Sequence, residues 1–198
     1  LQPHFNVVLF DEPYAGQSKQ YNSNRRPITK EQEASILLEL IERYRADHLM
    51  SFSWGGASAL LALAQRPARI RKAVVLAFSP LINSAMRDYL ERGIDLLVNC
   101  ERKALGELLN STIGEHLPSL VKRFNFRHII SLDEHEYHQM AFHVSQVLTQ
   151  DTRCYLRGSA DIDTPILFVN GDLDRYTSPE DAQHFNRYIR HCRFATVR

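Results

Sequence analysis

Ser53 is the residue of this sequence whose neighbours most favour covalent chemistry. It follows the short apolar run of residues 48–52 and is followed at once by Trp54 and the glycines Gly55 and Gly56. This order predicts a strand, a sharp turn and a helix, with Ser53 on the turn. A serine hydroxyl exposed on such a turn becomes a nucleophile when a neighbouring base takes its proton. The main-chain N–H of Trp54 would then donate to the oxyanion of the tetrahedral intermediate.

Residues 51–55 read S-x-S-x-G and resemble the nucleophile elbow of the α/β-hydrolase fold, which is usually written G-x-S-x-G. Ser51 replaces the first glycine, and serine is small enough to fit where a strand and a helix cross closely. Residues 11–18 form a D-x-P-x-x-G-x-S segment, similar to the loop that follows the strand before the elbow in many α/β-hydrolases. The alternative interpretation is that Ser53 caps the helix after an ordinary turn. Because both segments occur together, we favour the nucleophile.

Asp174 is the candidate acid of a catalytic triad. It lies in residues 170–175, N-G-D-L-D-R, just past a predicted strand. Catalytic residues of such a fold gather at the carboxyl ends of the strands, so a triad acid is expected on this loop. Asp174 would hold a histidine in one tautomer and stabilise its charged form. Asp172 stays an alternative, as does a solvated loop acid; we favour Asp174 because G-x-x-D is the usual spacing.

The histidine of this triad is missing from its expected place. In the chain order serine, aspartate, histidine it must follow Asp174, and only His184 and His191 do so. His184 falls in a predicted helix, and His191 precedes the last predicted strand. We therefore expect the catalytic histidine beyond residue 198, and the second oxyanion donor before residue 1. The chain is thus expected to be truncated at both ends and, made alone, to be inactive.

The elements that must position these residues alternate between strands and helices. Strands are predicted over residues 6–10, 48–52, 73–78, 165–169 and 193–197, and helices over residues 30–44, from the elbow to about 67, and from 178 onward. Thr29 and Gln32 fit a capping box at one helix start, and Ser178 and Pro179 fit another. This alternation predicts a mostly parallel sheet with helices on both faces.

Residues 81–160 show no strand signal and are predicted to form several helices, with breaks at Gly114 and Pro118. A helical insertion at this point in a strand–helix series is typical of a lid. The predicted organisation is therefore an α/β-hydrolase core in residues 1–80, a helical lid insertion in residues 81–160, and the second part of the core in residues 161–198.

The histidines of the predicted insertion are weaker candidates. His135 and His138 could share a helix face, but no zinc-type ligand spacing is evident, so we expect no metal site. His128 and Asp133 match an H-x4-D acyltransferase signature. A pattern with two fixed positions matches easily by chance, and the alternative is that both are ordinary residues of a helical lid.

The composition and charge of the chain limit the classes of function to be expected. The 198 residues are 44% hydrophobic and 24% charged, with a formal net charge of +1, as in ordinary soluble globular proteins. This balance suggests neither nucleic-acid nor membrane binding, and no apolar stretch approaches the roughly 20 residues that span a bilayer. The three cysteines are scattered, and no signal peptide is visible. These features favour a reducing, cytoplasmic location.

The chain resembles the 3-hydroxyacyl-acyl-carrier-protein:coenzyme A transacylases of medium-chain polyhydroxyalkanoate synthesis, which are close to the enzymes that make the lipid moiety of rhamnolipids. The resemblance is carried by residues 5–11 (F-N-V-V-L-F-D), 36–42 (I-L-L-E-L-I-E), 50–58 (M-S-F-S-W-G-G-A-S), 86–90 (M-R-D-Y-L), 116–120 (H-L-P-S-L) and 170–182. The S-x-S-W-G-G elbow is far more specific than G-x-S-x-G and accounts for the missing first glycine.

The resemblance implies Ser53 as nucleophile, Asp174 as acid, and a histidine in a G-H-F segment just beyond residue 198. Members of the group also carry the H-x4-D pattern found at His128 and Asp133. The implied reaction passes a medium-chain (R)-3-hydroxyacyl group from acyl carrier protein to coenzyme A, with no bound cofactor. Side chains expected to shape the acyl pocket are Ile82, Leu97, Leu105, Leu108 and Leu109. Basic residues that are candidates to dock an acidic carrier or a phosphate are Arg25, Arg26, Lys122, Arg123 and Arg127. The alternative is that they are solvated surface charges.

Other acceptors and other classes of protein stay open at the level of the sequence. A thioesterase would use the same triad with water in place of coenzyme A. A rhamnolipid-type ester synthase would use a second hydroxyacyl chain as acceptor. A binding protein on a hydrolase fold would use no triad at all.

Overall fold

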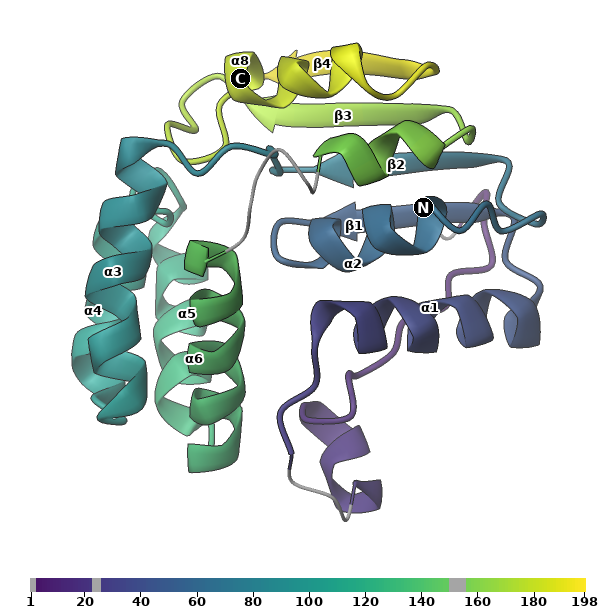
Figure 1. The fold of residues 1–198 in the computed structure, drawn as a ribbon. Coiled ribbons are helices and arrows are strands. Elements are labelled where there is room, and N and C mark those ends of the chain that lie inside the picture. Colours follow the sequence, from purple (N-terminus) through teal and green to yellow (C-terminus); the bar gives the residue numbers. More distant parts are fainter. Residues whose placement is uncertain (1–2, 23–25, 150–155) are drawn as a thin grey trace.

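The computed structural model of the chain describes residues 3–22, 26–149 and 156–198. Within these residues the sheet has four parallel strands in the order β1–β2–β3–β4. The strands are β1 (His48–Phe52), β2 (Lys72–Leu76), β3 (Ile166–Gly171) and β4 (Cys192–Val197). Because all of them run the same way, their carboxyl ends meet at one edge of the sheet (Figure 1). The parallel sheet that the alternation of strands and helices predicts is confirmed.

The strand expected over residues 6–10 does not form, so that prediction is wrong. The segment has no regular structure, and its side chains are exposed, Leu9 by 89%. An apolar run predicts a strand from side chains alone, whereas a strand also needs a neighbour that pairs with its backbone. Among the described residues β1 and β4 form the edges of the sheet, and neither pairs with this segment. Instead the Phe5 ring meets the His48 ring edge-on at 5.7 Å.

The core lies between the sheet and the helices that precede or join its strands. These are α1 (Lys30–Tyr44), α2 (Gly55–Leu63), η2 (Ser159–Asp161), α8 (Pro179–Ala182) and η3 (Gln183–Arg187). Successive strand side chains point to opposite faces, so alternate residues enter the core. Val75 of β2 and Phe168 of β3 are buried in one cluster with Leu60 of α2. Phe168 also stacks on Phe185 of η3, with ring centroids 4.7 Å apart.

Two helix starts follow the predicted capping signals. The Thr29 hydroxyl accepts from the N–H of Gln32 at 3.3 Å, and Oε1 of Gln32 accepts from the N–H of Thr29 at 2.9 Å. Both partners of the capping box at the start of α1 are therefore present. At α8 the Ser178 hydroxyl accepts from the N–H of Asp181 at 3.1 Å, with Pro179 in the first turn. Both predictions are confirmed, because capping depends on residues only a few positions apart.

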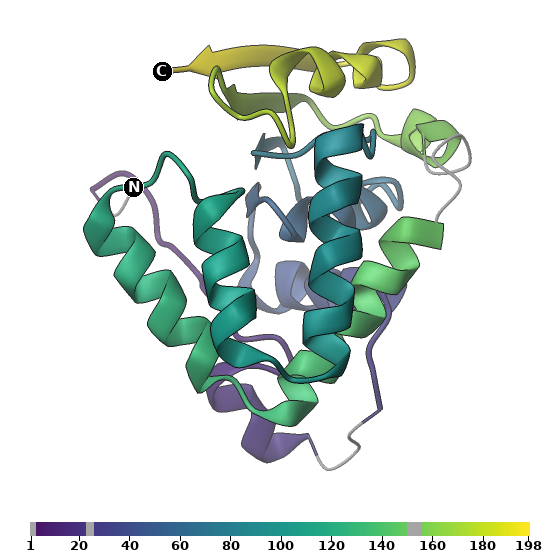
Figure 2. The same cartoon turned by 90° about the vertical axis from the view of Figure 1, so that its left-hand side faces the viewer.

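Helices α3 (Ser84–Val98), α4 (Arg102–Ser111), α5 (Ser119–Ser131) and α6 (Glu134–Thr149) lie between β2 and β3 in the sequence and are called the helical layer below. The layer has a hydrophobic core of its own, in which Leu97, Leu105 and Tyr137 are buried. Figure 1 shows the arrowheads of the strands pointing toward the layer, and Figure 2 shows its helices in front of the sheet. The layer therefore faces the carboxyl ends of β1 and β2, while β3 and β4 lie above it in both views. No helix in the described ranges is long and apolar enough to cross a bilayer.

Candidate active site

Ser53 lies on the turn between β1 and α2 in a strained conformation. Its φ is 48°, in the left-handed region that residues with a β-carbon rarely occupy. The N–H of Ser53 donates to the carbonyl of Leu76 on β2 at 2.8 Å, and the N–H of Gly56 donates to the carbonyl of Ser53 at 2.8 Å. These two bonds hold the turn on both sides of the serine. A strained residue fixed in this way at the end of a strand is a feature of functional sites.

The small residues around Ser53 differ in how much space they have. A β-carbon on Gly55 would lie 3.9 Å from Cβ of Ser51, which is an ordinary contact. The structure therefore has room for serine in place of the first glycine of the G-x-S-x-G pattern. A β-carbon on Gly56 would lie 2.5 Å from Cγ of Phe78, which no real contact allows. The close approach thus falls on Gly56, one residue beyond the pattern. The only sign of it in the sequence is that Gly55 is followed directly by a second glycine.

Asp174 lies on the loop that follows β3, and its carboxylate accepts three hydrogen bonds from that loop. Its Oδ1 accepts from the N–H of Tyr176 and from the N–H of Thr177, both at 2.9 Å. Its Oδ2 accepts from the hydroxyl of Thr177 at 2.6 Å. The buried amide of Asn170 steadies the same loop by donating to the carbonyl of Thr177 at 2.7 Å. Asp172 is exposed, and its N–H donates to the carbonyl of Val197 at 2.9 Å.

Ser53 and Asp174 follow the carboxyl ends of β1 and β3, which flank β2 on either side. With neighbouring strands about 4.8 Å apart, the two strands are separated by roughly 10 Å. The carboxylate of Asp174 bonds to Tyr176 and Thr177 and not to Ser53. A strand separation of this order would admit one imidazole between the two loops. His191 is at the opposite edge of the sheet, because its carbonyl accepts from the N–H of Ile166 at the start of β3. His184 lies within η3, as its predicted helical position implies.

Asp133 and His128 occupy different environments. Oδ1 of Asp133 accepts from the N–H of Glu136 at 2.9 Å, and Oε2 of Glu136 accepts from the N–H of Asp133 at 2.9 Å. Asp133 thus acts as the N-cap of α6, and it also pairs with Lys19 at 3.0 Å. His128 is exposed on α5. No hydrogen bond joins the two residues in the described structure, and an acyltransferase role for this pair stays a prediction.

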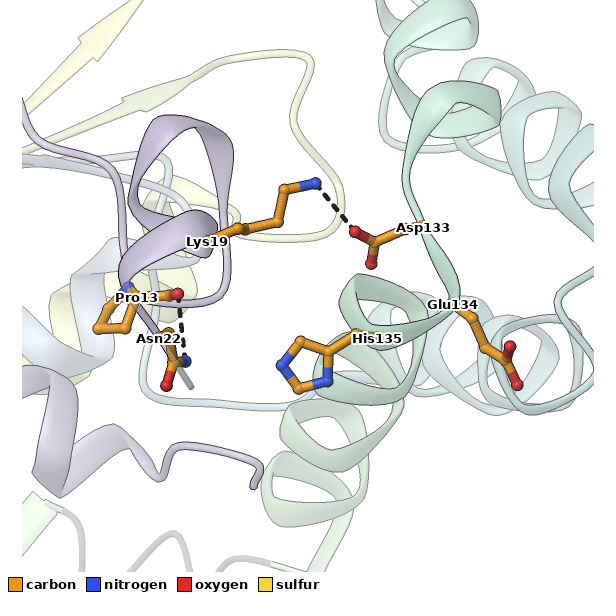
Figure 3. Close-up of a pocket in the computed structure, with 6 residues that line it drawn as sticks. All are labelled: Pro13, Lys19, Asn22, Asp133, Glu134 and His135. Atoms are coloured by element: carbon orange, nitrogen blue, oxygen red, sulfur yellow. Dashed lines mark hydrogen bonds and ion pairs between the residues drawn. The ribbon is translucent and has the colours of Figure 1, made fainter. Parts of the chain in front are cut away.

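A polar cavity of about 240 Å³ lies beside Asp133, and Ser53 is not among the residues that line it. Figure 3 shows Lys19 reaching from η1 (Gly16–Tyr21) toward Asp133 across this cavity. The residues that line it are Pro13, Lys19, Asn22, Asp133, Glu134 and His135. Among the residues that the structure describes, no group of three or more histidine, cysteine or acidic side chains could hold a metal ion there or elsewhere.

The side chains expected to bind substrate and carrier are distributed over the helical layer. Leu97, Leu105 and Leu108 are at most 5% exposed, while Ile82 and Leu109 are half-buried. A second hollow, of about 220 Å³, is lined by Asn110, Lys122, Arg123, Phe126 and Arg127. It therefore gathers the basic residues expected in the insertion. Arg26 is exposed, and Arg25 lies outside the described residues.

A buried polar cluster beside the elbow was not predicted from the sequence. Glu33 of α1 is 2% exposed and is contacted by three donors. Lys30 donates to Glu33 at 2.7 Å, the Ser58 hydroxyl donates at 2.5 Å, and the Tyr14 hydroxyl donates at 2.7 Å. His143 of α6 lies 3.5 Å from the same carboxylate. The cluster therefore joins the loop before α1 to α1, α2 and the helical layer.

The charges in this cluster are set by burial and by one another. Burial alone would raise the pKa of Glu33, but the charge of Lys30 and the bonds that Glu33 accepts hold that pKa below its ordinary value. Burial lowers the pKa of Lys30 and, with the charge of Lys30, the pKa of His143. Burial and the charge of Glu33 raise the pKa of Glu12 to about 7. The cluster is thus built around one buried ion pair, Lys30 with Glu33.

Comparison with known proteins places this arrangement in context. A family model described as alpha/beta hydrolase fold matches residues 1–197. A relative from Pseudomonas aeruginosa, named (R)-3-hydroxydecanoyl-ACP:CoA transacylase, is 60% identical over 198 residues, and one of the same name from Ectopseudomonas oleovorans is 58% identical over 198 residues. The chain spans 66% and 67% of their respective lengths. A hydrolase from Oleispira antarctica matches with a TM-score of 0.70 and 19% identity, over 86% of this chain and 64% of that one.

Proposed function

Because the chain belongs to the α/β-hydrolase fold family, we propose that it carries the nucleophile and the acid of an acyltransferase. The reaction moves a medium-chain (R)-3-hydroxyacyl group from acyl carrier protein to coenzyme A, for use in polyhydroxyalkanoate synthesis. Relatives named as (R)-3-hydroxydecanoyl-ACP:CoA transacylases, at 60% and 58% identity, support this reading. The observation that carries it is the left-handed backbone of Ser53, φ 48°, at the sheet edge that also bears Asp174.

In the first half of the proposed reaction Ser53 takes the acyl group. Its hydroxyl oxygen attacks the thioester carbonyl while an imidazole, expected outside residues 1–198, takes the hydroxyl proton. The main-chain N–H of Trp54 donates to the oxyanion that forms. The carbon–sulfur bond then breaks, and the imidazolium returns the proton to the carrier thiol. The products of this half are a free carrier thiol and an ester on Ser53.

In the second half the thiol of coenzyme A gives its proton to the same imidazole and attacks the ester carbonyl. The bond to Ser53 breaks, and the serine oxygen recovers the proton. Asp174 accepts the remaining imidazole N–H, holds the ring in one tautomer and stabilises its charged form in both halves. The three hydrogen bonds that Asp174 accepts from its own loop support this role, because they hold the carboxylate in place independently of a histidine.

The helical layer supplies the lid in this proposal, with residues 81–160 as the lid region. It faces the carboxyl end of β1, which leads to Ser53, where the acyl-enzyme forms (Figures 1 and 2). A lid that excludes water favours transfer to a thiol over hydrolysis of the ester. The half-buried Ile82 and Leu109 are the better candidates to meet the acyl chain, because Leu97 and Leu105 are buried in the core of the layer itself.

The decisive experiment incubates the whole protein with 3-hydroxydecanoyl carrier protein, with and without coenzyme A. The expected product is 3-hydroxydecanoyl-coenzyme A, formed only when coenzyme A is present and abolished by Ser53→Ala. Free 3-hydroxydecanoate formed irrespective of coenzyme A would show a thioesterase. A dimeric hydroxyacyl ester would show a rhamnolipid-type synthase, and no product at all would indicate a binding protein.

A further inference from the structure

The single tryptophan of the chain, Trp54, is held by a histidine from the helical layer. Its indole N–H donates to Nδ1 of His143 on α6, 3.2 Å away. His143 is 1% exposed, whereas Trp54 is 39% exposed. Trp54 directly follows Ser53 and forms the N-cap of α2. The contact therefore joins the helical layer to the turn that carries the proposed nucleophile.

The partners of His143 fix its protonation state. The indole N–H can only donate, so Nδ1 must accept. Nε2 lies 2.7 Å from the carbonyl oxygen of Ile28, which can only accept, so Nε2 carries the proton. A neutral imidazole of this tautomer satisfies Trp54 and Ile28, while the amide nitrogen of Gln139, 2.9 Å from Nε2, donates to the same carbonyl of Ile28. A second proton, on Nδ1, would set two donors against each other and break the contact with Trp54.

Side chains of α6 and α1 hold this imidazole in place. Gln139 of α6 pairs with both main-chain groups of Ile28: its Oε1 accepts from the N–H at 2.8 Å, and its Nε2 donates to the carbonyl at 2.8 Å. Oε1 of Glu33 lies 3.5 Å from Nε2 of His143. Nζ of Lys30 lies 5.0 Å from the centre of the Trp54 ring. The indole is thus contacted from α1 and from α6 at once.

From this arrangement we propose that His143 is a positioning residue for acyl transfer. It holds the indole of Trp54 and thereby the backbone of Trp54, whose N–H donates to the oxyanion in the proposed mechanism. An oxyanion donor acts fully only when it is fixed before the charge develops. The inference rests on the proposed function. It implies that acyl transfer is fast only when α6 is packed against the elbow.

Two substitutions of His143 test the roles of its two ring nitrogens separately. In His143→Asn the side-chain oxygen can take the place of Nδ1 and accept from Trp54, while the bond to Ile28 is lost. In His143→Gln the amide N–H can take the place of Nε2 and donate to Ile28, while the acceptor for Trp54 is lost. Both variants shorten or replace the same buried ring, so a general loss of stability affects them alike. Trp54→Phe removes the indole N–H and keeps the backbone donor.

The first measurement uses the chain as it stands and needs no activity. Because Trp54 is its single tryptophan, indole emission reports on this contact alone. His143→Gln is expected to shift the emission to longer wavelength and to increase quenching by iodide, while His143→Asn keeps the wild-type spectrum. Identical spectra for the two variants, at equal thermal midpoints, would overturn the contact on which the proposal stands.

The second measurement follows transfer by the whole protein. His143→Gln is expected to lower kcat about tenfold or more with little change in KM, since a misplaced donor affects the transition state, while His143→Asn stays within about threefold of wild type. His143→Gln combined with Trp54→Phe should be no slower than the slower single variant. Equal kcat for the Asn and Gln variants would overturn the positioning role while the proposed function stands. A wild-type protein without transfer would overturn the proposed function itself, and the positioning role with it.

Discussion

A β-carbon on Gly56 would lie 2.5 Å from Cγ of Phe78, so the first turn of α2 packs directly against that ring. Phe78 follows β2 and stacks in turn on Phe185, with ring centroids 6.3 Å apart. The ring has little room to retreat, because it also packs against the buried core cluster. The position of the elbow relative to the sheet therefore depends on the absence of one side chain.

Gly56→Ala is expected to lower the free energy of unfolding by about 1–3 kcal/mol, the usual cost of forcing an extra methyl group into a packed core. Gly55→Ala is the matched control, since its β-carbon would meet only Cβ of Ser51 at 3.9 Å. A helical alanine in place of glycine gains up to about 1 kcal/mol, so the control should be neutral or more stable. Urea unfolding of the two variants measures the difference, and equal effects would contradict this packing.

The left-handed backbone of Ser53 is predicted to lower the free energy of unfolding of the chain. At φ 48° a β-carbon is disfavoured by roughly 1–2 kcal/mol, and glycine is not. Ser53→Gly should therefore be about 1 kcal/mol more stable than Ser53→Ala, although both lack the nucleophile and neither should transfer an acyl group. Denaturant unfolding of the pair isolates the strain, because the two variants differ only in the β-carbon. An alanine variant as stable as the glycine variant would show that the turn relaxes.

Local signals in the sequence predicted the elements well. Thr29 with Gln32, and Ser178 with Pro179, lie a few positions apart, and the bonds they form depend on that spacing alone. The strand over residues 6–10 failed because pairing requires a neighbouring strand, which an apolar run does not encode.

The candidate site was predicted only where its residues belong to a motif. Ser53 and Asp174 stand in segments with recognisable spacing, whereas the contact between Trp54 and His143 joins residues far apart in the sequence. One signal was present: Lys30 falls in register with Ala34 and Ile41 on the apolar side of α1, where a charge needs a buried partner. Which partner it meets depends on how α1, α2 and α6 pack, and no local pattern contains that information.

The choice between Asp174 and Asp172 is open to a direct test. Asp174→Asn keeps an oxygen for the N–H groups of Tyr176 and Thr177 but loses the charge that orients a histidine. In the whole protein kcat should fall by about three to four orders of magnitude, as when a triad acid loses its charge. Asp172→Asn is expected to stay within about twofold of wild type, because Asp172 is exposed. A larger loss in Asp172→Asn than in Asp174→Asn would reverse the assignment.

Asp133 is expected to contribute to the stability of the folded chain in the first place, and to catalysis only if the H-x4-D pair is functional. As the N-cap of α6 it accepts from the N–H of Glu136, and losing such a cap costs about 1 kcal/mol. Asp133→Ala should show this loss in urea unfolding, whereas Asp133→Asn keeps an acceptor and should recover most of it. His128→Ala, on the exposed side of α5, should change the free energy of unfolding by less than about 0.5 kcal/mol. A shared, large loss of kcat at normal stability in the His128 and Asp133 alanine variants would instead support the H-x4-D pair.

Glu12 is expected to make stability depend on pH near neutrality. Burial and the charge of Glu33 raise its pKa from 4.5 to about 7 in the folded chain. Between these values the folded state binds more protons than the unfolded state, so the contribution of Glu12 is present below pH 4.5 and is lost as the pH rises through about 7. Glu12→Gln cannot lose a proton, so its stability relative to wild type should grow steadily from pH 5 to pH 8. Glu39→Gln, on the exposed side of α1, is the control for removing one carboxylate. A difference for Glu12→Gln that stays constant with pH would mean that the Glu12 carboxylate is as well solvated in the folded chain as in the unfolded one.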